Sequence, residues 1–375
     1  MMRKSFRKIP LLLAVCGLAF ALAGCGGTSS PTERPPSWPP SAGLWCYDTR
    51  QRVDLTVVPA NDVHAAVGHV NDNPEAFILA IDEDVSTPGN TLTAANANLT
   101  VVGLGGVREI RSMGSRIFTV GLYPGDGVGS TVSLTLGNNI TLVGRAYGNH
   151  GSMDLVRVRN HGRLYMEAGS RITGHVNGGG STGNGFGAAV NIERYGTFTM
   201  RGGEITGNRT TSGDPVLAGG VSANYETSHF YMKGGHIHGN TRGANGYRAD
   251  IRINQGVVSL SGGARAYRII LASAGNNSSL TIGSGWSGTV YNLDLRGGGT
   301  GGTNWDNTIT GWTGNAVLQA ADGHTLSAAD LANIASARFV IGTAAAGVYR
   351  EQDLSLSDRR IDIESNEGVV QEITP

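Results

Sequence analysis

His236 and His238 are the side chains of this sequence best suited to bind a metal ion. They stand one residue apart, and on a β-strand such a pair points to the same face. With His175 or His229 as a third imidazole, they could hold a divalent transition metal. However, many zinc sites also require a carboxylate or a cysteine as a ligand, and neither accompanies these histidines in the sequence. We therefore expect exposed polar residues beside a turn, with no metal and no cofactor.

Glu204 is the acidic residue that shares a repeat position with Arg171 and His236. Hydrolysis of a glycoside requires a pair of carboxylates, and a calcium-dependent lyase requires several acidic oxygens with an Arg or Lys base. The repeats supply one carboxylate at this place. We expect an exposed ion pair between Glu204 and Arg171, worth about 0.2–1 kcal/mol, and no catalytic residue.

A non-catalytic binding function is the prediction that follows from this shortage of acids. The candidate binding wall consists of Arg171, Glu204, His236 and His238, with the polar loops 177–186, 209–217 and 241–247 beside it. Insertions on one face of a repeat array often carry binding, and Gly, Ser, Thr and Asn suit recognition of a glycan or a surface protein. A polysaccharide lyase or glycoside hydrolase acting on the wall stays open as the alternative, and a cluster of acids there would favour it.

Three copies of one motif set the architecture that must position these residues. The copies occupy 162–175, 196–208 and 228–240, and their methionines lie 34 and 32 residues apart. A period of this length indicates a solenoid or array. Each copy is preceded by another short alternating segment, so one period holds about three short strands. This arithmetic predicts an all-β parallel β-helix.

Alternation along the copies predicts which side chains point into the coil. Equivalent residues of stacked coils form columns about 4.8 Å apart. Leu134 and Ile140 lie 32 residues before members of two such columns and extend the array towards the N-terminus. The corner is predicted at Gly202–Gly203, where no Cβ must clear the next coil. The two inward columns are Met166, Met200 and Met232, and Ile172, Ile205 and Ile237.

Asn208 and Asn240 follow a glycine at equivalent turns, where His175 holds the corresponding position. Amide side chains stacked in this way form hydrogen-bonded ladders. We expect a structural ladder here.

The N-terminus carries a targeting segment rather than folded structure. Four basic residues precede the apolar run of residues 11–22, which is short for a membrane span. The ending Leu22-Ala-Gly-Cys25 resembles a bacterial lipobox. The resemblance implies a signal peptide over 1–24 and lipid on Cys25, and Gly26 in the next position favours the outer membrane. Residues 25–44 then form a Pro/Gly/Ser tether.

Composition excludes several other classes of protein. Removing the four basic residues of 1–24 from a total of 29 leaves 25 against 29 acidic residues, so no basic surface argues for nucleic acid. Cys16 leaves with the signal peptide and Cys25 carries lipid. Cys46 is then expected to be a buried thiol with no disulfide partner.

Both ends of the solenoid need covering, because an open coil exposes a sheet edge. Residues 45–75 are the predicted N-terminal cap, with a helix over Asn61–Asn71, Asn61 as its N-cap and an apolar face. The β-helix follows over 76–345. Towards the other end, a helix is predicted over 327–335, and residues 346–375 form cap strands, with 359–363 as one arm of a hairpin.

The motif Thr-Phe-Thr-Met-x-Gly-Gly-x-Ile-Thr-Gly-Asn at 197–208 resembles a family of bacterial surface lipoproteins. Those proteins carry right-handed parallel β-helix repeats of the pectin-lyase-like fold. The resemblance is strongest over 129–263 and extends over about 76–345. It implies the fold and agrees with the lipobox, but that fold hosts lyases, hydrolases and adhesins alike.

Overall fold

A computed structural model describes the chain from residue 38 to residue 297, with gaps at 115, 123–129, 146–152, 179–188, 212–217, 244–245, 274–277 and 284. Beyond residue 297 it describes 316–320, 339–342, 349–352, 360–363 and 370–373. The predicted signal peptide, Cys25, the first part of the tether and the helix expected over 327–335 lie outside the described residues.

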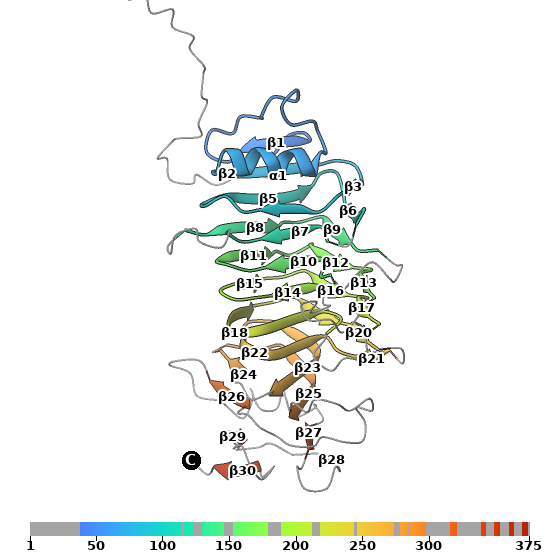
Figure 1. The fold of residues 1–375 in the computed structure, drawn as a ribbon, viewed down its shortest axis with the longest axis vertical. Coiled ribbons are helices and arrows are strands. Elements are labelled where there is room, and N and C mark those ends of the chain that lie inside the picture. The colour runs from blue at the N-terminus through green and yellow to red at the C-terminus, as the bar shows by residue number, and fades with distance from the viewer. Residues whose placement is uncertain are drawn as a thin grey trace, which may run out of the picture.

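The repeats stack as coils of parallel strands, confirming the solenoid (Figure 1). In the coils that contain the motif, three strands follow one another and each pairs in parallel with its equivalent in the next coil. We call the three resulting faces the first, second and third walls. The strands of two successive coils are β10 (Val156–Val158), β11 (Gly162–Met166) and β12 (Arg171–Thr173), then β14 (Val190–Ile192), β15 (Thr197–Met200) and β16 (Glu204–Thr206).

The walls extend on both sides of these two coils. The first wall also contains β4 (Asn90–Leu92), β7 (Phe118–Val120) and the first half of β18 (Val221–Met232). The second wall contains β2 (Ala76–Ile81), β5 (Asn98–Gly103), β8 (Val132–Leu136) and the second half of β18. The third wall contains β3 (Val85–Thr87), β6 (Arg108–Ser112), β9 (Ile140–Val143) and β19 (His236–His238).

The coils change after β19, where the described strands become longer and a single strand extends over two walls. The parallel stacking continues through β22 (Ile251–Leu260), β23 (Arg265–Ser273), β24 (Ser278–Ile282), β25 (Thr289–Gly297), β26 (Ala316–Ala320) and β27 (Phe339–Gly342). A small separate sheet runs along the stack where the predicted binding loops begin. It contains β13 (Val176–Asn177), β17 (Arg209–Thr210), β20 (Thr241–Arg242) and β21 (Tyr247–Arg248).

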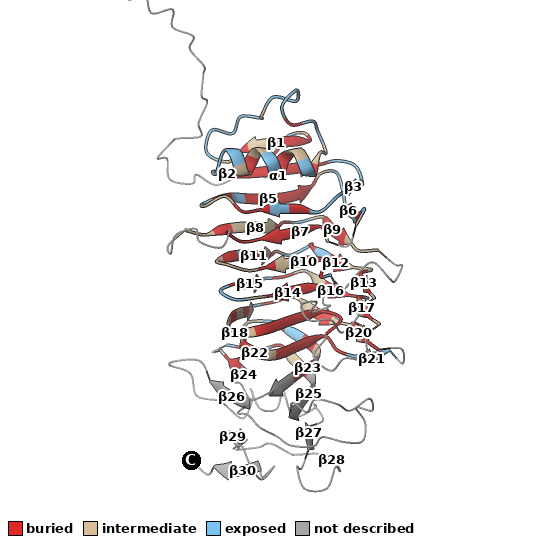
Figure 2. Ribbon diagram, in the orientation of Figure 1, coloured by how far each residue is buried: buried red, intermediate tan, exposed pale blue. Residues whose placement is uncertain are grey.

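Strand register confirms the predicted inward columns. Met166 pairs with Met200 and Met200 with Met232, and the three isoleucines align in the same way. These side chains are fully buried in one continuous core (Figure 2). The spacing predicted for the preceding coil is wrong by two residues. Leu136, not Leu134, pairs with Met166, because that coil is two residues shorter than the 32 expected.

The corner glycines are required by backbone shape and by close approach. Gly203 has φ +80°, and a Cβ on it would lie 2.5 Å from the carbonyl oxygen of Ser170 in the preceding coil. A Cβ on Gly202 would lie 2.8 Å from the Cα of Ala168. The corner predicted at Gly202–Gly203 is therefore confirmed, and its glycines let neighbouring coils come into contact.

The predicted asparagine ladder is also confirmed. The Oδ1 of Asn208 accepts a hydrogen bond from the backbone N–H of His175 at 3.1 Å, and the Oδ1 of Asn240 accepts from the Nδ2 of Asn208 at 2.9 Å. Asp250 ends the ladder, since its Oδ1 accepts from both the N–H and the Nδ2 of Asn240 at 2.9 Å. All four side chains are buried.

Helix α1 (Val63–Asp72) lies across the N-terminal end of the stack (Figure 1). Its buried face consists of Val63, Ala66, Val67 and Val70, as the sequence pattern predicts. The predicted N-cap is wrong by one residue. Asp62 caps the helix by accepting from the N–H of Ala65, whereas Asn61 has φ +63° and bonds to Asp82.

Strand β1 (Gly43–Cys46) precedes this helix and pairs antiparallel with β2. It begins at Gly43, inside the segment predicted as a tether up to residue 44. Cys46 is buried and disulfide-bonded, which contradicts the expectation of a thiol with no partner. That expectation rested on the removal of Cys16 and the acylation of Cys25. The partner cysteine lies outside the described residues.

The C-terminal strands pair differently from the coils. Strand β28 (Tyr349–Gln352) is antiparallel to β27, and β29 (Arg360–Ile363) is antiparallel to both β26 and β30 (Val370–Ile373). A change from parallel to antiparallel pairing ends the stack, in agreement with the predicted cap strands.

Candidate functional site

The predicted binding residues form a continuous outward column on the third wall. Arg171 of β12 pairs in register with Glu204 of β16, and Glu204 pairs with His236 of β19. His238 lies two residues along β19, beside Thr206. We call Arg171, Glu204, His236 and His238 the His–Glu column. The stacking of successive coils brings all four side chains together.

Glu204 is the centre of the His–Glu column. Its Oε2 lies 3.2 Å from the Nε of Arg171, which confirms the predicted ion pair, and its Oε1 lies 2.5 Å from the Nε2 of His238. The rings of His236 and His238 stack with centroids 4.1 Å apart. Burial lowers the pKa of His236, as do the nearby His238 and Arg265, while Glu204 raises it.

The statement that no carboxylate accompanies the two histidines is therefore wrong. Glu204, 32 residues before His236 in the sequence, supplies one, and the donor atoms of Glu204, His236 and His238 lie within 4.8 Å of one another. Neither histidine suggested as a third ligand is part of this group. His175 is buried with its Nε2 2.8 Å from the carbonyl oxygen of Met153, and His229 stacks on Tyr231.

A second cluster of charged residues lies on the first wall, and the sequence analysis did not find it. The Nε of Arg157 lies 2.7 Å from the Oδ2 of Asp154 and 3.2 Å from the Oε1 of Glu193. Arg116 adds its Nη2 at 3.2 Å from the same Asp154 oxygen. Arg157 stands on β10, between Thr119 of β7 and Asn191 of β14. Two carboxylates thus converge on this wall, contrary to expectation.

Burial governs the electrostatics of this cluster. Asp154 is fully buried, so its charge requires the two arginines, and removing one partner of such a buried pair costs about 3–5 kcal/mol. Burial raises the pKa of Glu193, with Arg157 acting against it. Burial also lowers the pKa of Arg116, partly offset by Asp154. For Arg157 the two carboxylates outweigh burial, and its pKa is raised.

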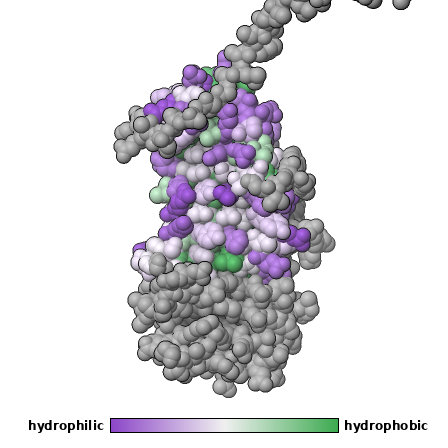
Figure 3. Space-filling view, turned by 90° about the vertical axis from the view of Figure 1, so that its left-hand side faces the viewer, coloured by the Kyte–Doolittle hydropathy of each residue, from purple (hydrophilic) through white to green (hydrophobic). Residues whose placement is uncertain are grey.

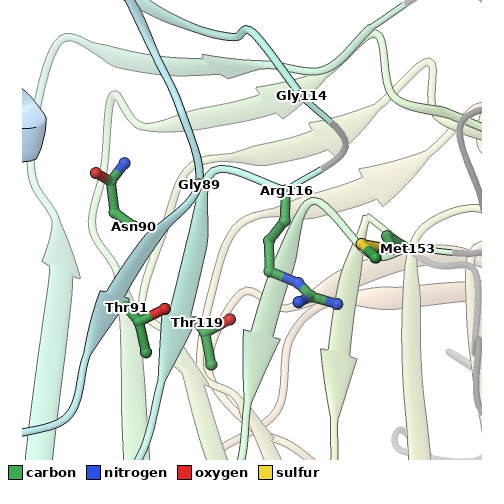
Figure 4. Close-up of a pocket in the computed structure, with 7 residues that line it drawn as sticks. All are labelled: Gly89, Asn90, Thr91, Gly114, Arg116, Thr119 and Met153. Carbon is green, nitrogen blue, oxygen red and sulfur yellow. The ribbon is translucent and has the colours of Figure 1, made fainter.

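A pocket of about 260 Å³ opens on the first wall next to this cluster (Figure 4). The side chains of Thr91, Thr119 and Arg116 lie side by side, and Asn90 points away from them. Met153 and two glycines complete the lining. Arg116 links the pocket to the buried cluster, since its guanidinium both lines the pocket and contacts Asp154. The pocket is therefore polar, with one cationic group.

The signal that could have revealed the cluster is weak. Asp154 precedes one first-wall strand and Glu193 follows the equivalent strand of the next coil, so both flank a repeat position without belonging to the motif. Arg116 lies 38 residues before Asp154. That spacing equals the register offset between Phe118 and Val156 on the same wall, but it is longer than the period of the motif, so the motif alone does not place Arg116 beside Asp154.

No family model, curated protein or solved structure matches the chain. In the described residues, no helix is long and apolar enough to cross a membrane. The two sites must therefore be interpreted from their geometry.

Proposed function

We propose that this chain is a lipid-anchored protein of the cell envelope, in the outer membrane, whose β-helix binds a glycan or a surface protein without catalysis. The fold we propose is the right-handed, pectin-lyase-like coil. The pocket on the first wall carries the binding proposal. It offers hydroxyls of Thr91 and Thr119 and the guanidinium of Arg116 on a rigid parallel sheet, which suits the hydroxyl and carboxylate groups of an acidic glycan.

The state of the nearby acids supports binding rather than hydrolysis. A glycosidase needs one carboxylate as general acid and a second as base or nucleophile. Asp154 is fully buried: its Oδ2 is held by two arginines, and its Oδ1 is shielded from solvent without a hydrogen-bond partner, so the carboxylate is not accessible to a sugar in the pocket. The face of the coils that Figure 3 shows is predominantly polar, as expected for recognition of hydrated groups.

A glycan array of the purified protein tests the binding proposal. Thr91→Val and Thr119→Val remove the hydroxyls while keeping shape and strand preference, and we expect at least a tenfold loss of affinity for any glycan that binds. Thr135→Val is the matched control, because Thr135 lies on β8 of the second wall. Equal binding by all three variants would refute the pocket as the site.

The enzyme alternative is favoured by one observation, the raised pKa of Glu193 beside a second carboxylate. A carboxyl with a raised pKa can serve as a general acid. Incubation with uronate-containing and neutral polysaccharides, followed by assays for new reducing ends and unsaturated products, decides between the two functions. Turnover that disappears in Glu193→Gln would replace the binding proposal with the enzyme.

The lipid anchor is tested separately, at the mature N-terminus. Mass spectrometry should find acyl chains on Cys25, and because an acylated sulfur cannot form a disulfide, no disulfide should join Cys25 to Cys46. In Cys25→Ala, the protein should no longer incorporate labelled palmitate and should no longer be recovered in the membrane fraction. A mature protein in which Cys25 carries no lipid, or is disulfide-bonded to Cys46, would refute the anchor.

A further inference from the structure

We propose that Glu204, His236 and His238 form a binding site for a divalent transition metal of the zinc class. Two imidazoles and one carboxylate are a donor set used by protein sites for zinc and related metals, with further coordination positions left open. This inference concerns the third wall and does not depend on the function proposed for the first wall.

The stacking of coils prepares the donor positions. His236 and His238 point to the same face of β19, and Glu204 stands on the adjacent strand in register with His236. A tetrahedral metal with bonds of 2.0–2.1 Å separates its donor atoms by about 3.3 Å. The three donor atoms lie within 4.8 Å of one another, so shifts of about 1 Å in their side chains would complete the geometry. All three side chains are half-exposed, which leaves them room for these shifts.

Arg171 orients the carboxylate. It holds the Oε2 of Glu204 at 3.2 Å, while the Oε1 faces His238. Partners of this kind fix the orientation of metal-binding carboxylates in proteins. The Nε2 of His238 and the Oε1 of Glu204 now share a hydrogen bond, which a metal ion would replace with two coordination bonds.

The charges around the site define what else it would bind. Glu204 contributes one negative charge, whereas Arg171 stands on one side and Arg265, in register with His236, on the other. With a divalent ion in place the site is positive. The position facing solvent would therefore take water or an anionic group such as a carboxylate.

Calorimetric titration of the tag-free, chelator-treated protein with Zn²⁺ tests the site. We expect one equivalent to bind and the thermal unfolding midpoint to rise with zinc concentration, because the ion joins two adjacent coils and binds the folded state. Co²⁺ should compete and give the absorption spectrum of a coordinated ion. Added chelator should reverse both effects.

Three variants identify the ligands: Glu204→Gln, His236→Asn and His238→Asn. Each should weaken zinc binding at least tenfold and abolish the zinc-dependent rise of the midpoint, while unfolding without zinc stays close to wild type. The matched control is His161→Asn, because His161 stacks on Tyr195 away from the column and has φ +63°, which asparagine tolerates.

Absence of saturable binding by the wild type would overturn the site and leave an ion pair between Glu204 and His238. Undiminished affinity in any one of the three variants would overturn the three-ligand assignment. An equal loss in the control would show that zinc binds to surface histidines in general, which also refutes the proposal.

Discussion

Asp250 ends the asparagine ladder as a buried carboxylate, and replacing it with asparagine should change how stability depends on pH. Its Oδ1 accepts two hydrogen bonds from Asn240, each 2.9 Å long. Burial raises the pKa of Asp250 from 3.8 to about 6, and these hydrogen bonds and Arg248 act against that rise. The fully buried side chain therefore favours the protonated form.

The size and sign of the effect follow from this pKa. One pKa unit corresponds to about 1.36 kcal/mol, so a rise from 3.8 to about 6 is equivalent to about 3 kcal/mol. Between these values the folded state binds more protons than the unfolded state. The stabilisation from Asp250 is therefore complete below a pH of about 3.8 and is lost as the pH rises through about 6. Asparagine cannot ionise and has no such loss.

Urea unfolding of the wild type and Asp250→Asn at intervals from about pH 4 to about pH 8 measures this effect. The two proteins share every other titrating group, so the difference in their free energies of unfolding isolates Asp250. We expect this difference to move in favour of the variant by about 2.4 kcal/mol across the range, because part of the stabilisation is already lost at about pH 4. A part of this difference that is the same at every pH would reflect the exchange of an oxygen for an NH₂ group. A difference that does not change with pH, or moves the other way, would refute the reasoning.

Three further substitutions test the coil interior. Burial lowers the pKa of His175 despite its hydrogen bond to a backbone carbonyl. The stability that His175 contributes is therefore present above a pH of about 6.5 and lost in acid. His175→Asn should reduce this acid loss in unfolding titrations, and an unchanged loss would contradict the assignment. Phe198 stacks on Phe230 with centroids 4.7 Å apart, and Phe198→Ala should lower the free energy of unfolding by about 3–5 kcal/mol, whereas a loss below about 1 kcal/mol would show that the column can collapse. Gly203→Ala should lower the free energy of unfolding by about 1–3 kcal/mol for its positive φ, and by more for the contact with the preceding coil. Gly263→Ala is the control, because open space surrounds its Cβ position, and its stability should stay near that of the wild type. Equal effects of the two substitutions would contradict the requirement for glycine at the Gly202–Gly203 corner.

Much of the scaffold follows from the sequence alone, because two regular periods coincide in it. Side chains alternate along each strand, and the motif returns after one coil. Together these periods place Met166, Met200 and Met232 in one inward column and Arg171, Glu204 and His236 in one outward column. The apolar face of the capping helix was also predictable, since it needs only the spacing of helical residues.

Tertiary structure alone decided which charged groups meet. Sequence registers hold only where coil lengths are equal, and the shorter coil before Met166 moved its partner from Leu134 to Leu136. The contacts that long side chains make between coils do not follow the spacing of the motif either. Glu204 contacts His238, although the motif aligns Glu204 with a different residue. Arg157 forms ion pairs with two acidic residues that lie outside the motif. The repeat determines the positions of backbones, whereas the contacts of long polar side chains depend on the corners and loops that the repeat leaves free to vary.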